Sequence, residues 1–138
     1  MYRNSEGYAD PTAGAAMSQI MREYKQKQKK LYAEKNRRKV YVASAYAGDV
    51  EANTAKAVEY CRMAIAAGYM PLASHLLYPQ ILNDNIPAER ELGLMFGFAL
   101  LRMCDEVWVC GPVSSGMAQE IEEAKRLKKK LVYKEVHE

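Results

Sequence analysis

Two kinds of hydrophobic pattern alternate along this chain. Short apolar runs rich in Val, Tyr and other strand-forming residues are typical of buried β-strands. These runs cover residues 39–44, 69–74, 106–110 and 130–133. Between them, apolar residues recur every three or four positions, which is the period of a helix with a buried face. The helical stretches cover residues 50–67, 87–104 and 116–128. This alternation predicts an α/β fold, with a parallel sheet of about four to five strands and helices on both faces.

Cap and turn residues place the ends of these helices. Asp49 is suited to cap the first helix, Gly68 to end it, and Pro87 to occupy the first position of the second helix. We expect the buried face of the first helix to carry Val58, Cys61 and Ile65.

The helix at residues 87–104 is apolar on almost every side. Its large apolar residues are Leu92, Leu94, Met95, Phe96, Phe98, Leu100, Leu101 and Met103. Such a helix is either buried on both sides or forms an interface between subunits. We therefore expect a homo-oligomer, a dimer or higher, that assembles through residues 88–104, with the N-terminal arm as a second candidate contact.

Positive charge is concentrated in the N-terminal part of the chain. Residues 1–39 hold ten Lys and Arg against four Asp and Glu, whereas the whole chain has a net charge of +3. We expect a flexible tail at residues 1–14, a basic amphipathic helical arm at 15–38 and an α/β domain at 39–138. The basic residues of the arm either form a solvated helix face or, as a weaker hypothesis, bind nucleic acid.

Several classes of protein do not fit the composition. The longest apolar run, residues 92–101, is shorter than the roughly 20 residues of a membrane-spanning helix. The polar N-terminus does not resemble a signal peptide, and three cysteines without paired spacing are typical of buried thiols in a reducing compartment. We therefore expect a cytoplasmic protein with no membrane partner. With two histidines and no Walker A or Gly-x-Gly-x-x-Gly motif, we expect neither a metal nor a cofactor.

Three loops should meet at the carboxyl ends of the strands, where open parallel sheets bind ligands. They cover residues 45–49, 74–77 and 111–116. The third loop leads into a helix whose first N–H groups can bind an anion, and Ser114 and Ser115 either add hydroxyl groups or only cap the helix. Glu120 follows a turn later, where it serves as a nucleophile or base, or only complements the helix dipole.

Two tyrosines and a histidine accompany these loops. Tyr41 lies in the first strand and Tyr46 in the loop after it, and either can stack on a nucleobase or pack in the core. His75 follows the second strand, where it either contacts a phosphate or a base or has a structural role.

Three segments carry a family resemblance. They read Val-Tyr-Val-Ala-Ser-Ala-Tyr at residues 40–46, Cys-Asp-Glu-Val-Trp-Val at 104–109 and Ser-Ser-Gly-Met-Ala-Gln-Glu at 114–120. Together they resemble the nucleoside 2-deoxyribosyltransferase-like superfamily, whose Ser-x-Gly-x-x-x-Glu pattern is similar to the last segment. The chain is most similar to small, often phage-associated relatives of that superfamily. The resemblance covers residues 39–135 and implies a Rossmann-like (flavodoxin-like) sheet and a nucleoside or nucleotide ligand.

The resemblance also implies roles for individual residues. Glu120 would attack the anomeric carbon of the sugar, and Tyr41 would orient that carboxylate. The residues implied in ligand binding are Ser44, Ala45, Tyr46, Gly48, His75, Ser114, Ser115, Gly116 and Met117. Among these, Ser115 and Gly116 match a loop that receives a 5′-phosphate.

One position departs from the superfamily pattern. Classical members carry an acidic residue eight positions before the aspartate that starts the third strand, and counting back from Asp105 gives Gly97. Candidate substitutes are Asp84, Glu89 and Glu91. Two main hypotheses follow: an N-glycosidase or deoxyribosyltransferase-like enzyme that acts through Glu120, or a non-catalytic module that binds or sequesters a nucleotide.

Overall fold

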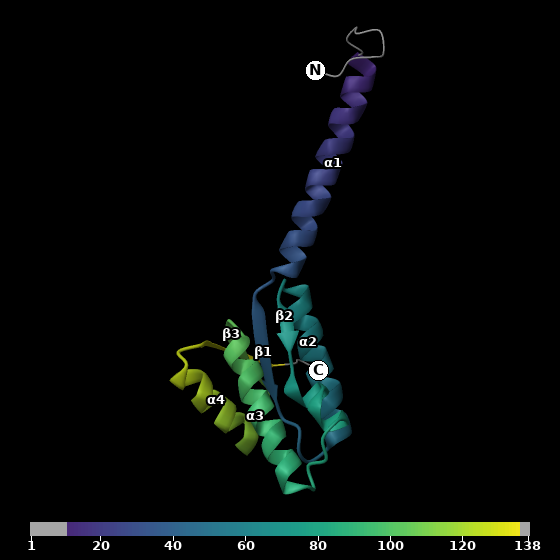
Figure 1. Cartoon of the computed structure of the whole chain (residues 1–138). Coiled ribbons are helices and arrows are strands. Elements are labelled where there is room, and N and C mark those ends of the chain that lie inside the picture. The colour runs from purple at the N-terminus through teal and green to yellow at the C-terminus, as the bar shows by residue number, and fades with distance from the viewer. Residues whose placement is uncertain (1–10, 136–138) are drawn as a thin grey trace. The chain divides into compact units, whose positions relative to one another are not determined.

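The computed structural model describes residues 11–135, and the chain divides into two compact units between Arg37 and Arg38. Helix α1 (Pro11–Lys35) belongs to the first unit, and the sheet and the other helices belong to the second (Figure 1). Residues 1–10 of the expected tail lie outside the described residues. The helix begins at Pro11, four residues before the expected start, because proline is well suited to the first position of a helix.

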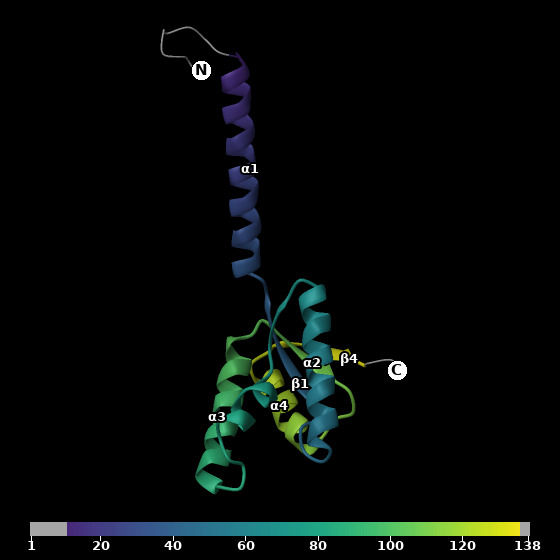
Figure 2. The same ribbon diagram turned by 90° about the vertical axis from the view of Figure 1, so that its right-hand side faces the viewer.

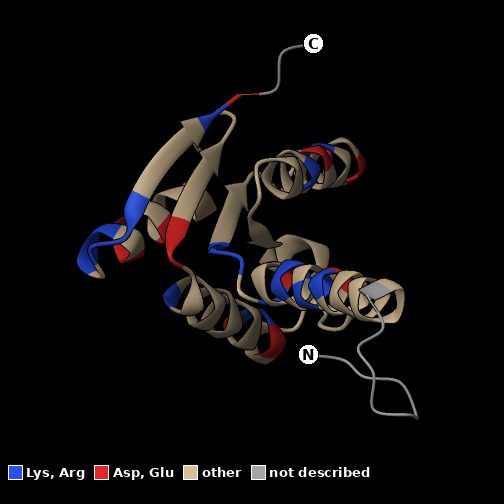
Figure 3. Ribbon diagram, turned by 90° about the horizontal axis from the view of Figure 1, so that it is seen from above, with Lys and Arg blue, Asp and Glu red and all other residues tan. Residues whose placement is uncertain are grey.

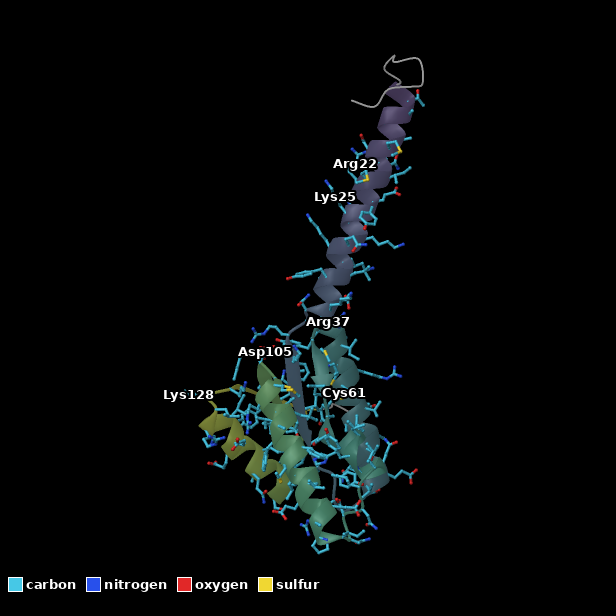
Figure 4. All side chains as sticks on the ribbon, viewed as in Figure 1. Arg22, Lys25, Arg37, Cys61, Asp105 and Lys128 are labelled. Carbon is cyan, nitrogen blue, oxygen red and sulfur yellow. The ribbon has the colours of Figure 1, made fainter. Side chains whose placement is uncertain are left out.

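Helix α1 presents its side chains to solvent. Every residue from 15 to 35 is exposed, including the apolar Ile20 and Leu31. Arg22 and Lys25 project away from the helix in Figure 4. The described part of this unit therefore has no buried core of its own.

The sheet of the second unit consists, within the described residues, of four parallel strands. They are β1 (Lys39–Ser44), β2 (Met70–Leu72), β3 (Glu106–Cys110) and β4 (Lys130–Lys134). Their order is β2-β1-β3-β4, so the first strand lies inside the sheet and the second at its edge. In this register Tyr41 lies between Leu72 and Val107. The arrangement confirms the Rossmann-like α/β fold.

Helices cover both faces of this sheet, as Figures 2 and 3 show. The three helices are α2 (Val50–Ala66), α3 (Pro87–Met103) and α4 (Ser115–Arg126). α2 packs on one face, and α3 and α4 pack on the other. Two short 3-10 helices, η1 (Ser74–Leu76) and η2 (Tyr78–Gln80), connect β2 to α3.

The predicted ends of α2 are confirmed. The Asp49 side chain accepts a hydrogen bond from the backbone N–H of Ala52 (3.1 Å), which satisfies one free donor at the start of the helix. Gly68 follows the helix with φ of 90°, a conformation that favours glycine.

Strand β1 sends alternate side chains to opposite faces of the sheet. Val40 and Val42 pack with Tyr60 and Ala64 of α2. Tyr41 and Ala43 instead pack with Leu101 of α3 and Ala124 of α4. Because successive side chains of a strand point in opposite directions, this alternation decides which β1 residues can reach α4.

The buried face of α2 differs from the predicted one. Its buried residues are Ala57, Tyr60 and Ala64. Val58 and Ile65, predicted on this face, are exposed, and Cys61 is only partly buried. The spacing of the buried face is the predicted one, but it is displaced by one residue, which corresponds to a rotation of about 100°. The two alanines let the helix approach the sheet closely, although they are a weaker hydrophobic signal than Val and Ile.

Strand β2 is shorter than the predicted run of residues 69–74. It is an edge strand that contains Pro71, and a residue without an N–H is tolerated only at such an edge. The chain then coils into η1 at Ser74.

Helix α3 is not buried on both sides. Among its residues only Gly97 and Leu101 are fully buried, and most of its large apolar side chains are exposed. Within the second unit, the first of the two sequence-based explanations for its apolar surface is therefore wrong.

We predict that Ala64→Leu destabilises the fold by about 1–3 kcal/mol, because Ala64 is fully buried and extra methyl groups would force α2 away from β1. Urea denaturation would measure the loss. Val58→Leu on the exposed side of the same helix should change stability by less than about 0.5 kcal/mol. Equal effects of the two substitutions would contradict the observed face.

Candidate functional site

A cleft lies at the carboxyl ends of β1 and β2, between the η1–η2 segment, α3 and α4. The residues that line it include Tyr46, Ser74, His75, Gly97, Gly116 and Glu120. Two aromatic residues, Tyr78 and Phe98, and two charged residues, Asp84 and Arg90, extend the lining. This is the end of a parallel sheet at which ligands bind.

The packing of α4 carries Glu120 into this cleft. The buried face of α4 consists of Met117, Glu120, Ile121 and Ala124, at the spacing of three and four that defines one side of a helix. Glu120 is therefore only 8% exposed although it carries a carboxyl group. A buried carboxyl in a cleft is a marker of a functional site.

A chain of hydroxyl groups holds one oxygen of Glu120. Tyr41 Oη lies 2.8 Å from Ser74 Oγ and 3.3 Å from Glu120 Oε1. The carboxylate can only accept, so the phenol donates its one hydrogen to Glu120 and accepts the hydroxyl hydrogen of Ser74. The chain fixes the orientation of the carboxylate from β1 and η1.

Burial shifts the pKa values of both partners. It raises the pKa of Glu120 from 4.5 to about 7, and the hydrogen bond from Tyr41 only partly offsets this increase. Burial, reinforced by the charge of Glu120, raises the pKa of Tyr41 far above its usual range. The phenol therefore remains a donor, while Glu120 is divided between its ionised and protonated forms near neutral pH.

His75 completes the cluster from η1. Its ring stacks on Tyr46, with the ring centroids 5.3 Å apart and the planes at 14°. Its Nε2 atom lies 3.7 Å from Glu120 Oε1, which is longer than a hydrogen bond. Burial lowers the pKa of His75, and the nearby carboxylate of Asp84 opposes this shift. The imidazole is therefore mainly neutral at pH 7, and its contact with Glu120 is not an ion pair at that pH.

The second oxygen of Glu120, Oε2, is buried and has no hydrogen-bond partner among the described residues. Gly97 borders the same cluster, because a Cβ atom there would lie 3.5 Å from Ser74 Oγ and 3.6 Å from Tyr41 Oη. A buried oxygen without a donor is unfavourable in a folded protein, so this arrangement is typical of a site that a ligand completes.

The structure does not bring Ser44 together with Glu120. Ser44 and Ala45 line a second cleft with Asn53 and Lys56, but Ala45 also packs against the cluster that contains Met117 and Ile121 of α4. Ser44 has the same strand parity as Val40 and Val42, so its side chain lies on the face opposite Tyr41. Its Oγ is buried and has no hydrogen-bond partner in the described part of the chain.

The predicted loop residues before Glu120 separate into different roles. Ser114 caps α4 by accepting a hydrogen bond from the Met117 N–H (3.3 Å), and the Met117 side chain is fully buried in the core. Ser115 and Gly116 are exposed at the start of α4, and Gly116 lines the cleft. Gly48 lies in an exposed turn with φ of 98°.

Most of the residues that line the cleft were not among the predicted site residues. Ser74 donates to Tyr41, and its only sequence signal is a small polar residue at the end of a predicted strand. Arg90 comes from the start of α3, which carries no functional pattern, and Asp84, from the segment before α3, was expected only as a substitute for the missing acid. Their place depends on how that segment folds back onto η1.

The described residues form neither a metal-binding cluster nor a membrane-spanning helix. Within residues 11–135, no three His, Cys, Asp or Glu side chains come together as metal ligands. None of the described helices combines the length and the apolar character needed to cross a membrane.

Glu120→Gln should stabilise the fold at high pH. Because the folded-state pKa is raised, the protonated carboxyl favours folding at low pH, and this contribution is lost as pH rises from about 4.5 through about 7. The variant has no such loss, so its stability relative to the parent chain should increase with pH, by up to about 3 kcal/mol at pH 8.

Denaturant unfolding at pH 5 and pH 8 would measure this change. The matched control is Glu122→Gln, because Glu122 lies on the same helix with its side chain in solvent. A stability difference for Glu120→Gln that does not depend on pH would show that the carboxyl is not held in a desolvated position.

The fold is shared with two solved structures. One is a 2-deoxyribosyltransferase from the psychrotolerant bacterium Bacillus psychrosaccharolyticus, with 15% sequence identity, a TM-score of 0.57 and coverage of 70% of this chain and 72% of that one. The other is a 2-desoxiribosyltransferase from Leishmania mexicana, with 16% identity and a TM-score of 0.52; the match covers 72% of this chain but only 65% of that one. At this identity the likeness shows a common fold.

Comparison with known sequences defines the family. No curated protein matches the chain. The model of a family described as Domain of unknown function (DUF7768) matches residues 38–134, which is nearly the whole second unit. The chain belongs to this family.

Proposed function

We propose that this protein cleaves the N-glycosidic bond of a nucleoside or nucleotide, with Glu120 as the nucleophile. The observation that carries the proposal is the buried carboxylate at the cleft, with Oε1 held by Tyr41 and Oε2 without a partner among the described residues. The fold shared with two 2-deoxyribosyltransferases supports it.

The reaction proceeds in two displacements. The ionised Glu120 attacks the anomeric carbon, an ester bond forms between the carboxylate and the sugar, and the base leaves with the electron pair of the broken C–N bond. Water or a second base then attacks the same carbon and releases the carboxylate. Water gives hydrolysis, and a second base gives transfer. Asp84, which lines the cleft, is the candidate acid that protonates the departing base.

The surroundings of Glu120 suit a nucleotide. The stacked pair of Tyr46 and His75 offers a flat apolar surface to a base. The exposed start of α4 at Ser115 and Gly116 offers N–H groups to a 5′-phosphate. The reaction requires no cofactor. In this proposal residues 39–138 form the catalytic domain of a homo-oligomer, and the arm at residues 15–38 is an accessory element.

A second candidate function is nucleotide binding without turnover. The observation that favours it is Gly97, which places no side chain beside Tyr41 and Ser74 where the resemblance to the superfamily implies an acidic residue. In that case the cleft sequesters or senses a nucleotide, and Glu120 only contacts the sugar.

We predict that Glu120→Gln lowers base release by at least about a thousandfold, because the amide is a poor nucleophile. Chromatography of free base from a panel of ribonucleosides, deoxyribonucleosides and their 5′-monophosphates would measure this loss. Ligand binding by calorimetry should persist in the variant. Base release that is unchanged in Glu120→Gln would refute the assignment, and tight binding without turnover by the parent chain would favour the second function.

We expect Tyr41→Phe to change the pH dependence of base release. The parent activity should rise as Glu120 ionises around pH 7, and loss of the hydrogen bond from Tyr41 raises the pKa of Glu120 further. The rising limb of kcat/KM should therefore move by about one pH unit to higher pH. A uniform loss of activity at all pH values would instead indicate damage to the fold of β1.

A further inference from the structure

An apolar stripe runs along the outer side of α3. Its residues are Leu92, Met95, Phe96, Ala99 and Met103, and all five are exposed. Their spacing of three, one, three and four places them on one side of the helix, like the seam of a helix pair. The buried residues of α3, Gly97 and Leu101, lie on the opposite side, toward the cleft and the sheet.

Two opposite charges flank the same edge of this stripe. Glu91 and Arg102 are both exposed and stand eleven residues apart, which is close to three full turns. They therefore project from α3 in nearly the same direction, one at each end of the stripe. In an antiparallel pair of identical helices related by a twofold axis, the same edges of the two helices meet, so each Glu91 would face an Arg102.

The stripe and the charges place the twofold axis within one residue of each other along the helix. The midpoint between Leu92 and Met103 falls between residues 97 and 98, and the midpoint between Glu91 and Arg102 falls one residue earlier. One residue corresponds to about 1.5 Å along a helix, well within the reach of an arginine side chain. An axis at this position also sets Phe96 opposite Ala99 of the partner subunit, a large side chain against a small one.

A parallel pair of α3 helices lacks this complementarity. In a parallel pair the twofold axis runs along the helices. The Glu91 edge of one copy then lies against the opposite edge of the other copy, at the same position along the helix axis. That opposite edge carries Glu89, which places like charges together and leaves Arg102 beside the apolar Leu100.

From these observations we infer that the exposed stripe of α3 is the interface of a homodimer, in which two α3 helices pack antiparallel about a twofold axis with Glu91 paired to Arg102 of the partner subunit at both ends. The inference does not depend on the proposed catalytic function, since its test measures assembly and not turnover. It also explains why a helix with this many apolar residues leaves its outer side uncovered by the other elements of the second unit.

Light scattering coupled to size-exclusion chromatography of the full chain tests the interface. The parent chain should be a dimer, and Met95→Glu should be a monomer, because Met95 is 58% exposed at the centre of the stripe. Met63→Glu is the matched control, because Met63 is an exposed methionine on α2, on the other face of the sheet. That variant should remain a dimer.

The charge pairs provide a second test that does not remove apolar surface. Glu91→Lys alone and Arg102→Glu alone should each raise the dimer Kd by about tenfold, because each change turns both symmetric pairs into repulsive ones. The double variant restores opposite charges and should recover most of the affinity. On α4, Glu123 pairs with Arg126, and Arg102 adds a weaker favourable charge interaction with the same carboxylate, which Glu91→Lys leaves intact and Arg102→Glu removes.

Three results would overturn the inference. They are a parent chain that is monomeric at the highest concentration reached, a dimer that survives Met95→Glu, and charge reversals whose effects simply add in the double variant. A dimer abolished by Leu31→Glu in α1 but not by Met95→Glu would assign assembly to the arm instead.

Discussion

The desolvation of one carboxyl group is the physical constraint around which the candidate site is built. Glu120 is buried because it shares a helix face with Met117, Ile121 and Ala124, so the packing that holds α4 on the sheet also holds the carboxyl out of water. Tyr41, on a strand inside the sheet, donates a hydrogen bond to this carboxyl group, and Ser74 of η1 is hydrogen-bonded to Tyr41. Elements far apart in the sequence are thus coupled through hydrogen bonds that only the folded chain can form.

This constraint places stability and chemistry in opposition. A carboxyl group with a pKa of about 7 is easier to protonate in the folded chain than in the unfolded one, so ionising it for use as a nucleophile weakens the fold. Proteins commonly retain such unfavourable groups only where a function requires them. The neutral state of His75 near pH 7 is consistent with this view, since a histidinium at 3.7 Å would stabilise the ionised carboxylate.

Much of the fold could be predicted from the sequence, because its signals are local. The β-branched runs of β1 and β3 and the caps of α2 lie where the pattern places them. The face of α2 could not be identified correctly, since the close approach of Ala57 and Ala64 to the sheet is a tertiary property that the weak apolar character of alanine does not signal.

The candidate site was harder to assemble from the sequence than the fold. Tyr41 and Glu120 do meet as the resemblance implied, but Ser44 lies on the other face, which the two-residue period of a strand already indicates when counted from Tyr41. The stacking of His75 on Tyr46 and the place of Asp84 depend on the path of the segment between β2 and α3, and no local pattern encodes that path.

The two edges of the sheet limit how this fold can gain neighbours. An exposed strand edge can recruit another strand, from a binding peptide or from an aggregating copy. At one edge, β2 has only three residues and includes Pro71, which offers no N–H to an incoming strand. At the other edge, β4 begins and ends with lysine, a charge that discourages strand addition. Both edges of the described sheet therefore discourage strand addition, so that helix surfaces are better suited than strand edges to contact another protein.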